Sequence, residues 1–191
     1  DVKGELVLTN VGFRYSPEGK DILKNINLSV KSGEVIAIVG SSGSGKTTLT
    51  RILDGSYTGY SGSIQLDETE LSTVSISSLH QYISSVRQDI QLFSQNIRFN
   101  LTLDNPNITE EHLQEAIQRT RAGDVVERLG QNKEMREGGG DVSVGEGQLL
   151  TFARMMAHQP TIVILDEATA SIDSITERKI QEAIDEIFST K

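Results

Sequence analysis

The stretch that decides the fold is Gly40-Ser41-Ser42-Gly43-Ser44-Gly45-Lys46-Thr47, which meets every fixed position of the pattern G-x-x-x-x-G-K-[ST]. The continuous apolar run Val35–Val39 precedes it, and Leu49, Ile52 and Leu53 follow at helical spacing. This order predicts a buried strand, a glycine-rich loop and a helix with one buried face. Backbone N–H groups in such a loop point toward phosphate oxygens, and the helix N-terminus adds positive potential. The stretch therefore predicts a site for the phosphates of a nucleotide.

The residues of this loop have separate expected roles. Lys46 is expected to place a mobile positive charge on the phosphates, as a binding and a catalytic residue, and the Thr47 hydroxyl is expected to bind Mg²⁺. The expected nucleotide-binding set consists of Gly40, Ser41, Ser42, Gly43, Ser44, Gly45, Lys46, Thr47 and Thr48. A merely flexible glycine- and serine-rich loop is the alternative interpretation. The complete pattern between a predicted strand and a predicted helix disfavours it.

Two successive carboxylates, Asp166 and Glu167, end the apolar run Ile162–Leu165. A strand that ends in this way places both acids at the carboxyl edge of the sheet, where ligands collect in open α/β folds. We expect Asp166 to hold Mg²⁺ and Glu167 to polarise the attacking water as a general base. Two solvated acids after a strand are the alternative, which the neighbouring phosphate loop disfavours.

The composition narrows the class of protein. The chain has 191 residues and a formal net charge of −9, which argues against a nucleic-acid partner. The absence of cysteine excludes disulfides and thiolate metal sites. We expect no signal peptide and no membrane span, because no apolar run approaches the roughly 18 residues that a span needs. If a membrane matters, another chain or segment crosses it.

Short apolar runs alternate with helix-period segments, which predicts an α/β fold with a P-loop NTPase core and a mainly parallel sheet. The alternating residues 7–15 and 22–30, joined by a turn, predict an N-terminal antiparallel β lobe. The polar segment 81–158 predicts a helical lobe. We predict one domain, with the core and β lobe in residues 1–80 and 159–191.

Two helix starts are marked by capping residues. Thr109, followed by two glutamates, predicts the first. Ser174-x-x-Glu177 reads as a capping box for the last helix, which places Ile180, Ala183 and Ile187 on one face. Both helices are therefore expected to bury one apolar side.

The segment Asp141–Gln148, which reads DVSVGEGQ directly before a helix, resembles the signature motif of the ATP-binding cassette (ABC) ATPases, usually LSGGQ. Ser143 and Gly145 keep the serine and the second glycine of that motif. The segment is similar to the LSVG-type signatures of some exporters. Ser143 and Glu146 also form S-x-x-E, which predicts a capping box, and the two interpretations are compatible because a capped helix N-terminus also binds anions.

The resemblance covers nearly the whole chain. It implies that Tyr15 stacks on adenine, that Gln88 is the Q-loop glutamine, catalytic and bound to Mg²⁺, and that Asp173 belongs to the D-loop at the nucleotide. The segment from Gln88 to Leu101 is similar to exporter-type cassettes. Each residue has a plainer interpretation: Tyr15 covers the end of a hairpin, Gln88 alone says little, and Asp173 is a turn residue ahead of a helix.

The sequence departs from the family pattern in three places. Gly147 replaces the Arg or Gln usual after the signature, at a cost of roughly 1 kcal/mol relative to Ala. The loop 129–135 is a little shorter than exporters usually have. The family's switch histidine follows a strand beyond the last helix, and none of His80, His112 and His158 has that place. We therefore expect a domain truncated at its C-terminus, without the C-terminal strands, and weak hydrolysis by this fragment.

The resemblance implies a function as well as a fold. It implies ATP and Mg²⁺ as cofactors, a head-to-tail dimer with a second nucleotide-binding domain, homo- or heteromeric, and a partner transmembrane domain. ATP hydrolysis then powers export of a substrate from the cytoplasmic face of the plasma (inner) membrane, and no nucleic acid takes part.

The sequence is compatible with two other functions. The first is a regulatory half-site of an asymmetric transporter with little hydrolysis, which the altered signature favours mildly and Glu167 opposes. The second is a soluble ABC ATPase of translation or chromosome maintenance. The chain lacks the paired cassettes or long coiled-coil insertions usual there, and its negative charge also disfavours it.

Overall fold

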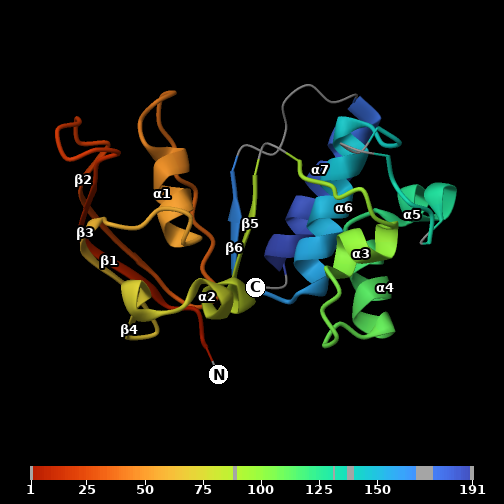
Figure 1. Ribbon diagram of the computed structural model, residues 1–191, viewed down its shortest axis with the longest axis horizontal. Helices are drawn as coiled ribbons and strands as arrows, with labels where there is room; N and C mark the ends of the chain where they lie inside the picture. The colour runs from red at the N-terminus through yellow and green to blue at the C-terminus, as the bar shows by residue number, and fades with distance from the viewer. Residues whose placement is uncertain (1, 88–89, 131, 137–139, 167–173, 190–191) are drawn as a thin grey trace. The chain divides into compact units, whose positions relative to one another are not determined.

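The computed structural model describes residues 2–87, 90–130, 132–136, 140–166 and 174–189 of the chain (Figure 1). These residues form two compact units. The first runs up to Ser85 and includes Pro160–Ile164, and the second comprises Val86–Gln159 and the chain from Leu165 onward. Within the described residues, no helix combines the length and the apolar character needed to cross a bilayer.

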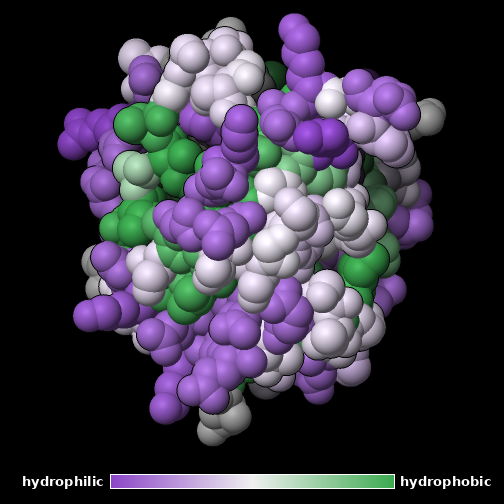
Figure 2. Space-filling view, turned by 90° about the vertical axis from the view of Figure 1, so that its left-hand side faces the viewer, coloured by the Kyte–Doolittle hydropathy of each residue, from purple (hydrophilic) through white to green (hydrophobic). Residues whose placement is uncertain are grey.

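The first unit contains a four-stranded antiparallel sheet. Its strands are β1 (Leu6–Phe13), β2 (Leu23–Val30), β3 (Ser61–Leu66) and β4 (Thr69–Glu70), in the order β2-β1-β3-β4. β1 is the central strand, and its Leu6 pairs with Val30 on one side and Leu66 on the other. Hydrophilic residues cover much of the side of the molecule on which this sheet lies (Figure 2). Because β1 and β2 pair antiparallel, the antiparallel pair expected at the N-terminus is present.

A β-bulge changes which side chains of β1 face the core. Leu6 and Leu8 are buried, and after a register shift the buried residues are Val11 and Phe13. Asn10 between them has a φ of 52°, a left-handed conformation that asparagine tolerates better than most residues. The bulge therefore divides the alternation of this stretch into two registers, because one extra residue exchanges the two faces of a strand.

Helix α1 (Lys46–Leu53) packs its apolar side into the same core as the sheet. Leu49, Ile52 and Leu53 are buried there, as their spacing predicted. The short elements η1 (Leu71–Thr73) and α2 (Ile76–Tyr82) lead from β4 to β5 (Ile83–Val86).

Strand β5 pairs with β6 (Ile162–Leu165) in a second, two-stranded sheet. The Asp166 N–H, just after β6, donates to the Val86 carbonyl at the end of β5, 2.9 Å away. Because the hydrogen bond joins the carboxyl ends of both strands, the two strands run in the same direction. The structure is thus an α/β fold with antiparallel and parallel sheets. A larger parallel sheet stays a prediction.

The segment Val35–Val39, predicted to be a buried strand, is neither a strand nor buried. Val35 is 53% exposed and Val39 88% exposed. An apolar run becomes a buried strand only where other strands flank it and a layer covers it, and among the described residues no strand pairs with this one. The segment is apolar, but its burial depends on neighbouring strands that the local sequence does not specify.

The second unit is helical and is built around α6 (Val144–Ala157). Helices α3 (Ile97–Thr102), α4 (Glu110–Arg119) and α7 (Ser174–Ser189) pack against α6, and α5 (Gly123–Leu129) packs against α4. Because α6 has neighbours on several sides, both Leu149 and Leu150 are fully or almost fully buried.

The two expected helix starts differ in outcome. The Thr109 side chain accepts from the His112 N–H and caps α4, as predicted. Ser174 is the first residue of α7 itself, so it does not take the N-cap position that the sequence predicted for it. The predicted face of α7 is correct, since Ile180, Ala183 and Ile187 are buried.

Candidate nucleotide-binding site

The phosphate loop is shaped by its glycines. Gly43 and Gly45 have φ values of 77° and 96°, in the left-handed region that glycine adopts without strain. A Cβ on Gly45 would also lie 2.8 Å from the Leu23 Cδ2 atom and 3.1 Å from the Ile22 carbonyl oxygen. Glycine at this position therefore lets the start of α1 approach the start of β2.

The start of α1 is open to an anion. Gly45 is its N-cap and supplies no side-chain acceptor to the first N–H groups of the helix. The Lys46 ammonium donates to the carbonyls of Gly40, at 2.8 Å, and Ser41, at 3.1 Å. Residues 40–44 and Thr47 are exposed. A cation and a glycine-shaped cradle at an uncapped helix start are the features that fit a nucleotide's phosphates.

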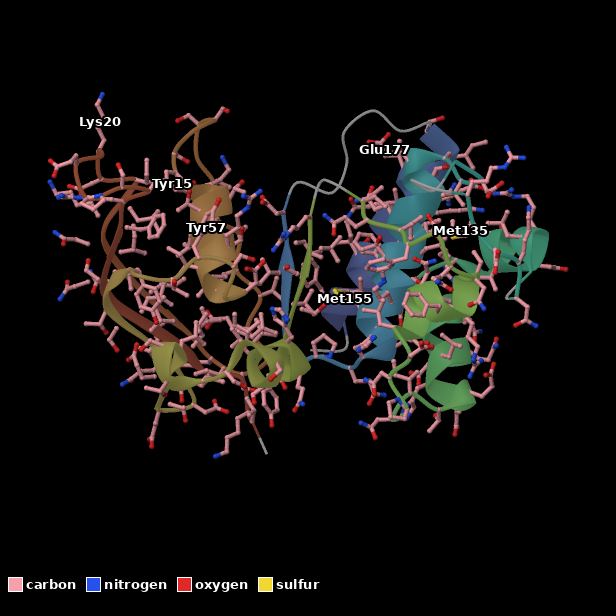
Figure 3. All side chains as sticks on the ribbon, viewed as in Figure 1. Tyr15, Lys20, Tyr57, Met135, Met155 and Glu177 are labelled. Carbon is pink, nitrogen blue, oxygen red and sulfur yellow. The ribbon has the colours of Figure 1, made fainter. Side chains whose placement is uncertain are left out.

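Tyr15 stands beside this loop and is attached to α1. Its hydroxyl is hydrogen-bonded to the Thr48 hydroxyl at 2.7 Å, while Tyr15 as a whole remains 60% exposed. Thr48, predicted to bind nucleotide, is itself buried. Figure 3 shows Tyr15 next to α1, with Tyr57 close by. The structure therefore brings an exposed aromatic ring and the phosphate loop together in one unit.

Of the predicted metal and catalytic residues, Lys46, Thr47 and Asp166 lie in the described part of the chain. Asp166 directly follows β6, at the carboxyl ends of the two parallel strands, and is half-buried. Gln88, Glu167 and Asp173 lie outside the described residues, so their predicted roles stay predictions.

The predicted signature residues lie at the start of α6. The Ser143 hydroxyl accepts from the Glu146 N–H at 3.2 Å, and the Glu146 carboxylate accepts from the Ser143 N–H at 2.8 Å. These two bonds form the predicted capping box. Gly145 is buried in the first turn of the helix.

Arg128 from α5 completes this arrangement by donating to the Glu146 carboxylate at 2.7 Å. Partial burial pushes the pKa of Glu146 up, but the Ser143 N–H and the Arg128 guanidinium outweigh burial and hold the pKa below its usual value. Glu146 is therefore held as a carboxylate that caps the helix and pairs with an arginine.

Gly147, which stands where the family usually has Arg or Gln, has a packing explanation. A Cβ at this position would lie 3.1 Å from the Ile90 Cγ2 atom and 3.5 Å from the Leu92 Cδ1 atom. The side of α6 that faces Ile90 and Leu92 is thus close to contact already, and a longer side chain there requires these residues to move.

Comparisons with known proteins decide the family. The model of the ABC transporter family matches residues 23–170. The chain belongs to the ABC transporter family. The resemblance seen in the sequence is thereby confirmed, and the loop, the carboxylates after β6 and the start of α6 all fall within the matched part of this ABC domain. ABC domains bind ATP, generally with Mg²⁺, and the glycine cradle with Lys46 fits such a ligand.

Two similar proteins have names that refer to transport or translocation. The chain is 38% identical over 184 residues to the probable multidrug resistance ABC transporter ATP-binding/permease protein YheH of Bacillus subtilis, covering 95% of this chain and 27% of that protein. It is 36% identical over 189 residues to the leukotoxin translocation ATP-binding protein LktB of Mannheimia glucosida, covering 98% and 27%. The chain thus spans about a quarter of the length of these ABC relatives.

A solved ABC structure is similar over the same extent. The structure of a bacterial Atm1-family ABC exporter with ATP bound matches with a TM-score of 0.86 and 30% identity, over 98% of this chain and 33% of that one. The chain is therefore an ATP-binding domain of the ABC exporter type.

Sequence reasoning missed several residues that organise this ABC domain. Arg154 of α6 donates to the Asn100 carbonyl at 2.5 Å and to the Gln91 carbonyl at 3.1 Å, and its guanidinium lies 5.6 Å from the centre of the Phe93 ring. It ties α6 to α3 and to the segment before α3. Tyr57 was also missed. The only signal for Arg154 was a charged residue beside the apolar face of a helix, and Tyr57 lies in an irregular loop without periodicity.

Proposed function

We propose that this chain binds Mg-ATP at the phosphate loop and hydrolyses it to power export of a substrate through a partner transmembrane domain. The observation that carries the proposal is the phosphate loop, with left-handed Gly43 and Gly45, Lys46 at its carbonyls and an exposed Tyr15 beside it. The coupling to transport is supported by the names of the relatives, a multidrug resistance ABC transporter ATP-binding/permease protein and a leukotoxin translocation ATP-binding protein.

Binding uses two kinds of contact. The first N–H groups of α1 and the Lys46 ammonium hold the β- and γ-phosphates, and the Tyr15 ring stacks on adenine. Thr47, Asp166 and Gln88 are the residues that hold Mg²⁺, which neutralises phosphate charge when it is bound. Glu167 accepts a proton from the attacking water, whose position Gln88 helps to fix.

The active site is composite in this proposal. Ser143 and Gly145 at the start of α6 of one copy, together with Asp173, close over the ATP held by the loop of another nucleotide-binding domain. Support comes from the start of α6, whose capping box leaves other N–H groups of the first turn to meet an anion. The partner domain is a second copy or a related chain, and the assembly lies at the cytoplasmic face of the plasma (inner) membrane without nucleic acid.

The decisive experiment is calorimetric titration of ATP with Mg²⁺ into the chain and its Lys46→Ala variant. The variant is expected to lose measurable binding, because each charge-assisted contact that the ammonium makes is worth on the order of 1.5 to 3 kcal/mol. Lys31→Ala removes an exposed lysine elsewhere and should bind like the unchanged chain. Unchanged affinity for ATP in a folded Lys46→Ala protein would contradict the assignment of this loop as the phosphate-binding site.

Composite assembly has its own test in mixtures of two mutants. Chains with Glu167→Gln and Ser143→Arg are mixed with chains that carry Lys46→Ala, and ATP-dependent dimers are measured by sedimentation. One site of the mixed dimer keeps a working loop and a facing signature, so the mixture should dimerise where neither mutant pairs with itself. Equal dimerisation by each mutant alone would return Ser143 to the role of a plain helix cap.

A regulatory half-site is the second candidate function. Glu146 in place of the usual glutamine, held by Arg128, favours it because the signature differs from the hydrolysing form of the family. Glu167 opposes it, since this carboxylate is the expected general base. Phosphate release by the intact protein under single-turnover conditions separates the two: turnover that Glu167→Gln abolishes supports the ATPase, and bound ATP without turnover supports the half-site.

A further inference from the structure

Three aromatic rings meet beside the phosphate loop: Phe13 ends β1, Tyr15 follows it, and Tyr57 comes from the loop after α1. The Phe13 and Tyr57 rings are stacked, with centroids 5.6 Å apart and planes 12° apart. The Tyr15 ring stands nearly perpendicular to both, at 88° to Phe13 and 85° to Tyr57, with centroid distances of 5.3 and 5.6 Å. Edge-to-face pairs of this kind have a preferred geometry, so Phe13 and Tyr57 together define the plane of the Tyr15 ring.

Tyr57 is held in place by α1. Its hydroxyl accepts from the Arg51 guanidinium at 2.8 Å, the guanidinium carbon lies 5.6 Å from the centre of its ring, and its N–H donates to the Arg51 carbonyl at 2.9 Å. The hydrogen bond to Tyr57 is the main reason that the pKa of Arg51 is raised. Tyr57 is therefore attached by three contacts to the last turn of the helix that begins in the phosphate loop.

Tyr15 is attached to the same helix at its other end. Its hydroxyl is hydrogen-bonded to Thr48 in the first turn of α1, while its ring meets Tyr57 after the last turn of α1. With these contacts in place, Tyr15 remains 60% exposed. The contacts thus fix the angle of the ring and leave surface for a planar ligand.

We propose that Tyr57, held by Arg51, is a positioning residue of the nucleotide site that sets the plane of the Tyr15 ring for stacking on the base. The inference rests on the proposed function, because Tyr15 must be the residue that meets adenine. Its consequence is that the base and the phosphates are bound by parts of one rigid unit, α1 and the residues attached to it. Tyr57 then acts on the affinity for the base and not on the affinity for the phosphates.

The test compares ATP with inorganic tripolyphosphate, which lacks the base, in calorimetric titrations of the chain. Tyr57→Leu should weaken ATP about three- to tenfold, the range that one aromatic pair provides, and leave tripolyphosphate unchanged. Tyr57→Phe keeps the ring and should stay close to the unchanged chain. Tyr60→Leu removes a partly buried tyrosine that bonds to Glu70 instead, and should alter neither ligand.

A coupling measurement separates positioning from general stability. If Tyr57 acts through Tyr15, the double variant Tyr15→Ala/Tyr57→Leu should bind ATP no more weakly than Tyr15→Ala alone. Equal weakening of ATP and tripolyphosphate by Tyr57→Leu would overturn the inference, as would full additivity. Should Tyr57→Leu fail to fold, Tyr57→Met, which keeps more of the volume, takes its place in the same comparison.

The outcomes distinguish the inference from the function on which it rests. If the unchanged chain, shown to be folded by its thermal transition, binds neither ATP nor tripolyphosphate, the proposed function fails. If both bind, Tyr15→Ala weakens ATP and Tyr57→Leu does not, the function stands and the positioning role of Tyr57 is wrong.

Discussion

The phosphate loop and the signature segment each lead into a helix, but they are built by different means. The loop meets every fixed position of its motif, and its shape depends on Gly45, whose backbone and surroundings exclude a side chain. The signature segment departs from its family at several positions, yet a capping box and the Arg128 pair hold it. Where the backbone conformation makes the site, glycine is required. Where side chains only cap a helix, other residues of suitable chemistry replace them.

Gly45→Ala is expected to have the largest effect on the phosphate loop. Its Cβ would meet Leu23 and Ile22 at a φ that alanine avoids, so we expect ATP affinity to fall more than tenfold and the melting temperature to fall as well. Gly43→Ala is the matched control, because its φ is also left-handed but no atom lies within 4 Å of the added Cβ. Gly43→Ala should lower the free energy of unfolding only by the roughly 1 to 2 kcal/mol that a left-handed backbone conformation costs an alanine. Similar losses of affinity in both variants would contradict a packing role for Gly45.

The contribution of Glu146, in the capping box at the start of α6, can be measured from the pH dependence of stability. Because the folded pKa of Glu146 lies below its usual value of 4.5, its stabilising contribution is present above pH 4.5 and is lost as the pH falls through the folded pKa. Glu146→Gln should flatten the acid limb of the free energy of unfolding by about 1 kcal/mol or less, measured by urea unfolding. Glu111→Gln, in the exposed first turn of α4, is the control. An identical acid limb in Glu146→Gln and the unchanged chain would show that the Arg128 pair contributes nothing.

The smallest effect is expected from Gly147→Ala. Helix propensity favours alanine by roughly 1 kcal/mol, and the approach of the added Cβ to Ile90 at 3.1 Å opposes it. The melting temperature should therefore change little. Gly147→Arg restores a residue type usual in the family, but it requires Ile90 and Leu92 to move and should lower the melting temperature. A stabilised Gly147→Arg protein would mean that packing does not explain the glycine.

Local patterns predicted much of the fold. The antiparallel pair, the buried face of α1, the cap of α4 and the capping box at Ser143 are all present, because each depends on residues close together in the sequence. The phosphate loop was predictable in the same way, since its glycines and lysine act through the backbone nearby.

Errors arose where distant neighbours decide the outcome. The alternation in β1 gave no sign of the bulge at Asn10, and the apolar run Val35–Val39 did not reveal that no described strand would flank it. Tyr57 lies outside any periodic element, so its contact with Tyr15 follows only from the way the loop after α1 folds back. Propensity and periodicity carry no information about such contacts.

The exposure of Val35–Val39 has a consequence for the behaviour of the chain in solution. The run contains four β-branched residues of the kind favoured in strands, carries no charge, and presents its apolar side chains to water. Short, uncharged segments of this composition are the ones through which polypeptides aggregate by pairing strand against strand. The net charge of −9 opposes such association by mutual repulsion, and added salt screens that repulsion. The colloidal stability of this chain should therefore decrease as the ionic strength rises.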